Sequence, residues 1–119
     1  MRAHQYWVLD GGLEGTAYRV SGGGDLDLAA RPSLAEALER AVASGAHTLE
    51  LDFTDVAFID STAIKVLVRA AVAVKERGGK LEVSVSSPNV LRIFAIAGVD
   101  RLFEVTLTLP TVPDEVEPV

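Results

Sequence analysis

The residues best placed to do chemistry in this chain stand together at Asp60-Ser61-Thr62. An acidic residue is followed by two hydroxyl residues, and an apolar helical pattern begins directly after them. All three residue types are favoured helix N-caps, each worth about 1 kcal/mol over alanine. One helix start needs only one cap, so the stretch leaves a second interpretation open, namely a serine that another protein modifies.

A helix N-terminus also favours negative charge, because its free backbone N–H groups and the helix dipole stabilise an anion there. The fold would therefore tolerate a phosphate on Ser61, which would add about −1.5 to −2 charges to an acidic neighbourhood. Such a modification predicts a switch at a binding surface rather than unfolding of the domain. Thr62 is the less suitable acceptor, since its β-branched hydroxyl is better placed for local support.

The surroundings of Ser61 argue against nucleophilic catalysis. His4 and His47 supply the missing residue type of a Ser-His-Asp triad, and both lie at the edges of the expected elements. Hydrolases of the common α/β type carry their serine in a Gly-x-Ser-x-Gly elbow, whereas Ile59 and Ala63 flank Ser61 here. We therefore expect no enzyme activity and no catalytic residue.

Metal and phosphate sites have equally weak signals. Asp52, Asp55 and Asp60 could hold a hard cation, but their spacing matches no calcium loop, and aspartates at strand ends more often form turns. The glycine run 22–24 is not followed by Gly-Lys-Ser/Thr, as a phosphate loop requires. The chain has no cysteine, which excludes a Cys₄ zinc site and a disulfide framework. We expect no metal and no cofactor.

Composition narrows the class of protein further. With 119 residues, 49% of them hydrophobic, the chain can bury the core of one domain. Eleven basic residues against 17 acidic ones give a net charge of −6, whereas direct nucleic-acid binding usually requires a basic face. The apolar run at 70–74 is far too short to cross a bilayer. These features predict a cytoplasmic protein without membrane insertion whose partners carry basic patches.

The elements that must position Ser61 follow from periodicity and turn residues. Residues 5–10 and 16–22 alternate as two strands of a hairpin across 11–15, and the second strand is expected to end at the glycine run. A helix is predicted over 31–45, with Ser33 and Glu36 as a capping box, Pro32 just before it and Gly45 at its end. A strand over 47–53 and a short apolar connection over 56–60 lead to the helix that starts at Ser61.

That second helix is predicted to end at Gly78-Gly79, with Ile64, Leu67 and Val74 on its core stripe. A strand at 80–86, a helix at 87–98 and a last strand within 99–109 follow. The order predicts an α/β fold, with a mostly parallel, mixed sheet of about five strands and three main helices packed chiefly on one face. We expect one domain over 1–109 and an acidic, proline-rich mobile tail over 110–119.

Four stretches in order resemble the STAS domain family, in particular the bacterial anti-sigma factor antagonists. The central one is "LDFTDVAFIDSTAIKVLVRAAVAVKERGGKLEV", which is similar to the family's strand, its aspartate-serine-serine/threonine-glycine turn and its second helix. The others are "GDLDLAARPSLAEAL" (24–38), "ERGGKLEVSVSSPNVLRIFAIAG" (76–98) and "DRLFEV" (100–105). The resemblance covers roughly residues 5–109.

The resemblance implies a partner switch. Family members bind an anti-sigma factor that is also a serine kinase with an ATP-binding fold, and this binding releases a sigma factor. The kinase ends the association by phosphorylating the serine at the helix start, and a serine phosphatase reverses the modification. By position Ser61 would be the phosphoacceptor. The implied partner-binding residues are Asp25, Leu26, Asp27, Asp60, Ser61, Thr62, Ala63 and Lys65.

This chain departs from the family pattern at a few positions. Ala63 stands where the family usually has glycine, and Asp25 replaces the commoner glutamate. The added methyl at position 63 is expected to narrow the choice of partner, because glycine permits a close backbone approach. An alternative function also stays open, in which the chain is a STAS regulatory subunit of a membrane transporter ATPase and Ser61 acts only as a helix cap.

Overall fold

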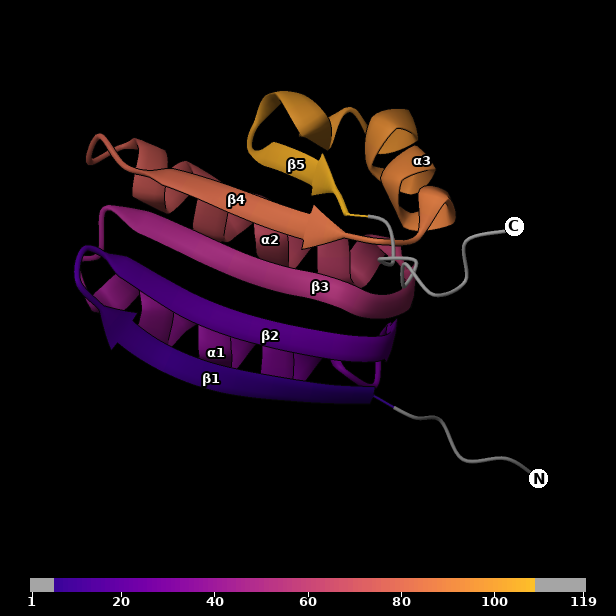
Figure 1. Cartoon of the computed structure of the whole chain (residues 1–119), viewed down its shortest axis with the longest axis horizontal. Coiled ribbons are helices and arrows are strands. Elements are labelled where there is room, and N and C mark those ends of the chain that lie inside the picture. Colours follow the sequence, from indigo (N-terminus) through magenta and orange to yellow (C-terminus); the bar gives the residue numbers. More distant parts are fainter. Residues whose placement is uncertain (1–5, 109–119) are drawn as a thin grey trace, which may run out of the picture.

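The strands form one five-stranded sheet in which the order along the chain is also the order in space (Figure 1). The computed structural model describes residues 6–108. β1 (Tyr6–Glu14) and β2 (Ala17–Leu26) are antiparallel, and β3 (Thr48–Ile59), β4 (Lys80–Val85) and β5 (Glu104–Leu107) continue parallel to β2. The predicted mixed sheet with an antiparallel hairpin at one edge is confirmed.

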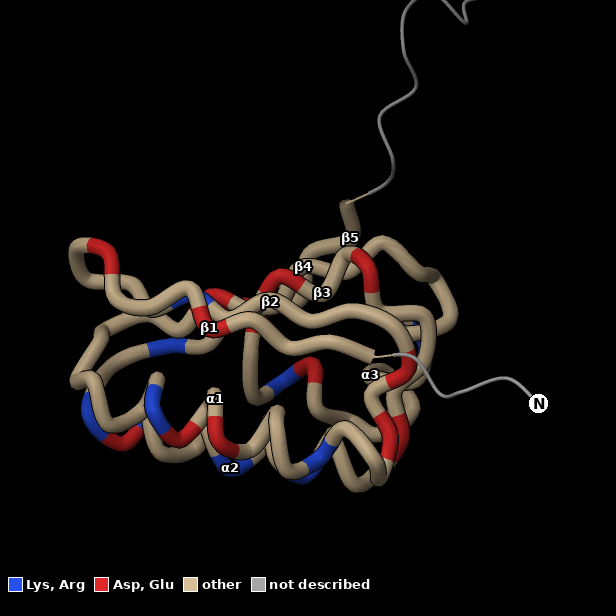
Figure 2. Tube along the Cα trace, turned by 90° about the horizontal axis from the view of Figure 1, so that it is seen from below, with Lys and Arg blue, Asp and Glu red and all other residues tan. Residues whose placement is uncertain are grey.

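The helices connect neighbouring parallel strands, so they lie on the same face of the sheet. They are α1 (Arg31–Ala43), α2 (Ser61–Lys75) and α3 (Pro88–Ala97), followed by the short 3₁₀ turn η1 (Val99–Arg101). Figure 2 shows α1 and α2 side by side beneath the sheet, and α3 packs against β3, β4 and β5. Within residues 6–108 the opposite face carries no helix, which confirms the one-sided packing.

The core lies between the sheet and this helix layer. Its largest fully buried side chains include Phe53, Phe94, Leu34, Leu51 and Leu67. Burial of apolar surface at about 25 cal/mol per Å² is the main stabilising term of such a layer. Beneath α3, the rings of Phe94 and Phe103 meet edge to face, with their centroids 5.6 Å apart. This layer holds the start of α2 at a fixed place beside the ends of β2 and β3.

The hairpin is longer than its sequence indicates. β1 runs through a bulge at Gly11-Gly12, and β2 continues through the glycine run to Leu26 instead of ending there. A Cβ atom on Gly23 would lie 2.3 Å from the indole ring of Trp7. Gly23 therefore allows the ring of Trp7 to lie against β2. Glycine often marks the end of a strand, but here it makes room for a side chain in the middle of the hairpin.

The predicted strand over 47–53 and the connection over 56–60 are one strand, β3. Its register against β2 shifts twice, between Ser21 and Gly23 and again between Gly24 and Asp25. At each shift β3 contains one residue more than the paired segment of β2, so the alternation of core-facing and outward-facing side chains along β3 is offset by one residue. The buried residues are Leu49, Leu51, Phe53, Val56 and Ile59. The irregular spacing after Phe53 broke the alternation on which the sequence prediction relied.

The predicted capping box of α1 is wrong. The helix begins at Arg31, its N-cap residue is Ala30, and no side chain caps it. A tight turn at Asp27 precedes the helix instead. The side-chain carboxylate of Asp27 accepts the N–H of Ala29 at 3.1 Å, and the backbone carbonyl of Asp27 accepts the N–H of Ala30 at 3.0 Å. Pro32 lies in the first turn of the helix, where a backbone N–H would have no partner within the helix, so proline is tolerated there. Ser33 follows Pro32 and therefore lies inside the helix, too late to cap it.

The later elements agree with their predicted bounds. Ser87 caps α3 by accepting the N–H of Val90 at 3.3 Å, and Gly98 ends that helix with a φ of +75°. The early part of the predicted first strand, His4 and the predicted tail 110–119 lie outside the described residues. The domain boundary at residue 109 stays a prediction.

Candidate functional site

Asp60 is the residue that caps α2. Its Oδ1 atom accepts the backbone N–H groups of Thr62 at 3.0 Å and Ala63 at 3.1 Å, and the hydroxyl of Thr62 at 2.6 Å. Burial alone would raise the pKa of Asp60, but hydrogen bonds from Thr62, Ala63 and the backbone of Leu28 outweigh it and lower that pKa. The cap is therefore an ionised carboxylate, and the interpretation of Ser61 as the cap is wrong.

Ser61 is the first residue of α2, and it is exposed. Its hydroxyl makes no hydrogen bond to any residue in the range 6–108, whereas the hydroxyl of the half-buried Thr62 is bound to Asp60. The two hydroxyls thus differ in chemical availability. A kinase could reach the Ser61 oxygen without breaking any contact within the described residues, but would have to displace Thr62 from its carboxylate.

The end of β2 and the start of α2 lie together, and Asp25, which the sequence interpretation placed in a loop, belongs to the strand. The N–H of Asp60 donates to the carbonyl of Leu26 at 3.2 Å, and Asp25 lies opposite Phe58 in the β2–β3 register. Figure 2 shows acidic residues gathered at this end of the molecule, where β2 and β3 terminate. The surface around Ser61 therefore carries negative charge before any modification.

Not every implied partner-binding residue is accessible. The side chains of Leu26 and Ala63 are fully buried, while Asp25, Asp27, Asp60 and Thr62 are half-buried. Ser61 and Lys65 are exposed, and their spacing of four residues places them on the same face of α2. The methyl group of Ala63 is buried in the core of the unbound chain, and the expectation that it narrows the choice of partner stays a prediction.

Two exposed apolar residues at this site were missed from the sequence. Leu28 is 68% exposed directly after Asp27, and Phe58 is 41% exposed beside Asp25. Phe58 looked like part of an apolar connection, because its outward orientation depends on the register shifts of β3. Large apolar side chains next to charged ones are typical of protein-binding surfaces. We call Asp25, Asp27, Leu28, Phe58, Ser61 and Lys65 the α2-start surface.

The geometry opposes catalysis by Ser61. His47 stands before the first residue of β3 and Ser61 after its last one, so the 12-residue strand separates them by about 40 Å. Among the described residues, the imidazole ring of His47 has one hydrogen-bond partner, the hydroxyl of Thr48 at 3.2 Å. Asp52 accepts both the N–H and the hydroxyl of Thr54 at the first register shift of β3, so its carboxylate supports the bulge of that strand. Within residues 6–108, no group of three potential ligand side chains could hold a metal ion.

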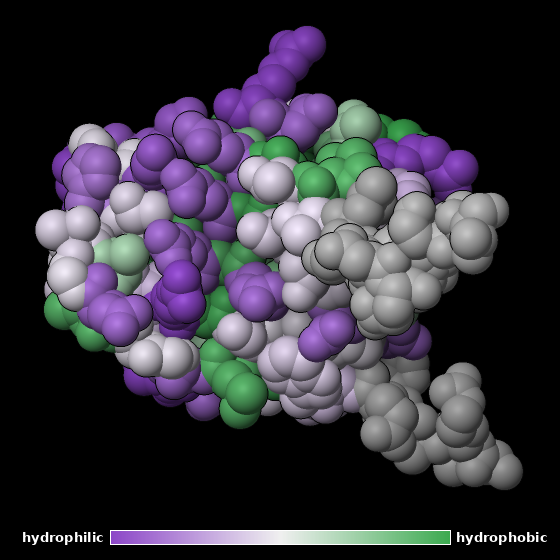
Figure 3. All heavy atoms as spheres, in the orientation of Figure 1, coloured by the Kyte–Doolittle hydropathy of each residue, from purple (hydrophilic) through white to green (hydrophobic). Residues whose placement is uncertain are grey.

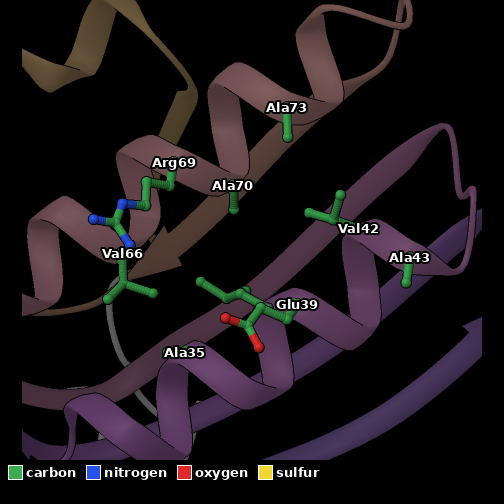
Figure 4. A pocket seen from close by; sticks show the side chains of 9 residues that line it. Ala35, Glu39, Val42, Ala43, Val66, Arg69, Ala70 and Ala73 are labelled. Atoms are coloured by element: carbon green, nitrogen blue, oxygen red, sulfur yellow. The ribbon is translucent and has the colours of Figure 1, made fainter.

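A separate apolar groove of about 270 Å³ lies between α1 and α2 (Figure 4). Small and branched residues such as Ala35, Val66 and Ala70 form its walls, and Glu39 and Arg69 are its charged lining residues. It contains no hydroxyl, thiol or imidazole group among these lining residues. The groove therefore offers apolar contact, and the exposed hydroxyl of Ser61 lies outside it, at the start of α2.

Comparison with known proteins assigns this arrangement to a family. The STAS domain model matches residues 13–113. The chain is 31% identical over 88 residues to the anti-sigma-B factor antagonist of Bacillus subtilis, a match that covers 74% of this chain and 80% of that one.

Solved structures share the fold. An anti-sigma factor antagonist from Mycobacterium paratuberculosis superposes with a TM-score of 0.77 at 23% identity, covering 97% of this chain and 94% of that one. The Bacillus cell fate determinant SpoIIAA in its phosphorylated form gives a TM-score of 0.63 at 16% identity, covering 94% and 96% of the two chains. At these identities the superpositions establish the fold alone.

Proposed function

The chain belongs to the STAS domain family, and we propose that it is an anti-sigma factor antagonist that phosphorylation of Ser61 switches off. One observation carries the proposal: Asp60 caps α2, so Ser61 stands at the helix start with an exposed hydroxyl that the fold does not use. The curated relative with 31% identity is named as an anti-sigma-B factor antagonist, which supports the same role.

The partner is an anti-sigma factor that is also a serine kinase with an ATP-binding fold. The α2-start surface supplies apolar contacts through Leu28 and Phe58 and negative charge through Asp25 and Asp27. This chemistry fits a partner surface with an apolar patch bordered by lysine or arginine. Binding occupies the anti-sigma factor, and the sigma factor is released.

The off-step is phosphoryl transfer from ATP. The Ser61 oxygen attacks the γ-phosphorus, the bond to the β-phosphate oxygen breaks, ADP leaves, and a base of the kinase takes the hydroxyl proton. A serine phosphatase reverses the step by hydrolysis, which returns the serine and inorganic phosphate. The transfer consumes one ATP and needs no further co-reactant, and this chain contributes only the acceptor oxygen.

The modified serine would sit in a favourable place for the fold and an unfavourable one for the partner. The N-terminal dipole of α2 and Lys65 four residues later both stabilise negative charge at position 61. For the partner, the phosphate adds about −1.5 to −2 charges and bulk to a surface built for close contact. Release would therefore follow without unfolding of the antagonist.

None of the described helices is long and apolar enough to cross a bilayer, and we propose a cytoplasmic location for the switch.

The test uses the full chain with the ATP-binding-fold serine kinase encoded nearest to its gene. Mass spectrometry should locate the phosphate on Ser61, and calorimetry should show that the phosphorylated protein has lost affinity for the kinase. Ser61→Ala should bind like the unmodified protein and stay bound in ATP, whereas Thr62→Val should still be phosphorylated and released. Phosphate on Thr62, or binding that survives modification of Ser61, would contradict the switch. Recovery of a transporter ATPase instead of this kinase from the native host would favour the regulatory-subunit alternative.

A further inference from the structure

The outer edge of β1 has no partner among the described residues. β1 pairs with β2 on one side, and it is the last strand of the sheet in Figure 1. In an antiparallel ladder, every second residue of an edge strand turns its N–H and C=O away from its neighbour. Such a row of unpaired groups is a template for another strand, and proteins usually block it with lysine, proline or a short strand.

Residues 6–10 of this edge carry no such protection. Trp7 is 39% exposed and Leu9 62% exposed, and both lie on the helix-free face, where Figure 3 shows hydrophobic and hydrophilic residues intermixed along β1. The one charged side chain in the segment, Asp10, is held by Arg40 of α1 at 2.6 Å and by the N–H of Gly12 at 3.2 Å. The edge is therefore apolar, and its single charge is already neutralised.

The segment is also ordered in advance. The indole ring of Trp7 lies against Gly23 of β2, because Gly23 has no side chain that would push the ring away from the strand. Fixing the ring beforehand reduces the entropy that a partner strand would have to overcome. The bulge at Gly11-Gly12 interrupts the edge, so a regular ladder can extend only over Tyr6–Asp10.

We propose that two copies of this chain pair through the Tyr6–Asp10 segments of β1, antiparallel about a two-fold axis at Val8. In this register Trp7 of each copy lies opposite Leu9 of the other, and aromatic–aliphatic pairs of this kind stabilise antiparallel strands. Asp10 lies opposite Tyr6, so the two carboxylates never face each other. A second copy is the occupant because the two-fold register forms the Trp7–Leu9 pair twice and keeps the two Asp10 carboxylates apart, each beside its own Arg40.

The result is a continuous ten-stranded sheet with a small interface. A five-residue ladder with two Trp–Leu pairs falls below the roughly 1,200 Å² of a standard interface, so the dimer is weak, with a dissociation constant in the micromolar to millimolar range. Antiparallel pairing points the two β3 strands in opposite directions, so the two Ser61 residues lie at opposite ends of the dimer. Each copy could then bind its partner independently. The inference goes beyond the proposed function, and the STAS match begins only at residue 13, after this segment.

Sedimentation equilibrium of the full chain from micromolar to millimolar concentration tests the dimer, and Trp7 is the only tryptophan, so its emission reports the same event. The average mass should rise toward that of a dimer while the emission shifts to the blue. Leu9→Glu places two new carboxylates diagonally across the axis and should weaken association by at least about tenfold. Ile96→Glu is the matched control, since Ile96 is 78% exposed on α3 and far from β1.

Hydrogen exchange supplies an independent measurement, with circular dichroism to verify that both variants are folded. The backbone amides of residues 6–10 should become more protected as the concentration rises. A chain that stays monomeric at millimolar concentration would overturn the proposal. It would be equally overturned by a dimer that Leu9→Glu leaves intact, or by one whose concentration-dependent protection lies outside β1.

Discussion

The hydroxyl of Thr62 donates to the Oδ1 atom of Asp60 over 2.6 Å, and the same oxygen accepts the backbone N–H of Thr62. The side chain of Thr62 is thus part of the helix cap, although it follows the exposed Ser61 directly in the chain. Two adjacent hydroxyls of similar chemistry therefore have different roles, one in holding the helix start and one facing solvent.

The first prediction separates the cap from the hydroxyl. Asp60→Ala removes the acceptor of two backbone N–H groups and one hydroxyl, and should lower the free energy of unfolding by about 1 to 2 kcal/mol. Ser61→Ala is the matched neighbour and should change it by less than about 0.5 kcal/mol. Urea unfolding followed by circular dichroism measures both. Equal losses in the two variants would mean that Ser61 shares the capping role.

The second prediction concerns acid. Hydrogen bonds lower the pKa of Asp60 against the effect of burial, and hydrogen bonds with Tyr18, Arg40 and Gly12 do the same for Asp10. A carboxyl whose folded pKa is depressed stabilises the fold above its ordinary pKa of 3.8, and this stabilisation is lost as pH falls through the lower folded value. Unfolding midpoints in urea should therefore be flat near neutral pH and fall below about pH 4.

The control for the acid response is Asp60→Asn, since asparagine is also a good N-cap but does not titrate in this range. Its unfolding midpoint should depend less on pH below about pH 4 than that of the unmodified chain, whereas Ser61→Ala should leave the full dependence. An unchanged acid profile in Asp60→Asn would show that the Asp60 cap does not contribute to acid unfolding.

The third prediction uses the contact between Trp7 and Gly23. Gly23→Ala places a methyl group 2.3 Å from the indole ring, so the exposed ring should swing toward solvent and its emission should shift to the red. Gly22→Ala is the matched control, because its methyl group would meet the buried ring of Phe53 at 3.3 Å instead. That variant should lose about 1 to 3 kcal/mol of stability through overpacking and keep the emission of Trp7. Fluorescence at low protein concentration, together with urea unfolding, distinguishes the two outcomes.

The fourth prediction concerns the apolar part of the α2-start surface, and it rests on the proposed function. Leu28→Ser and Phe58→Ser should each weaken binding to the anti-sigma factor by about tenfold or more, because exposed anchors of this kind carry much of an interface's affinity. Calorimetry with the unphosphorylated chain measures the loss. Ile96→Ser removes a similarly exposed apolar side chain from α3 and should bind like the unmodified chain. If all three variants bind equally, this surface is not where the partner docks.

The sequence was sufficient for the architecture because its helices and strands repeat with clear periods. The alternation of Leu81, Val83 and Val85 marks β4, and Gly98 marks the end of α3 as expected. At the glycine run the prediction was wrong because a tertiary contact had changed the meaning of a local signal. The glycine run of β2 looked like a strand end because nothing in the sequence reveals that Trp7 lies against Gly23.

The candidate site was predicted only in part for a similar reason. Asp60, Ser61 and the segment at Asp25 could be identified from residue types and order, and the structure brings them together. The accessibility of individual side chains depended on the register shifts of β3, which turn Phe58 outward and Ile59 inward. A register shift is a property of two paired strands, so the sequence of one strand does not reveal it.

The cap at Asp60 also bears on how such a domain can evolve. Because helix initiation depends on Asp60 and Thr62, position 61 is free of any folding requirement within the described structure. If Ser61 is the phosphorylation site that we propose, a single codon change there would remove or restore it at almost no cost in stability. Copies of the gene could then become permanently active or regulated antagonists without compensating mutations elsewhere. Differences in regulation between such copies would then depend on whether residue 61 carries a solvent-facing hydroxyl.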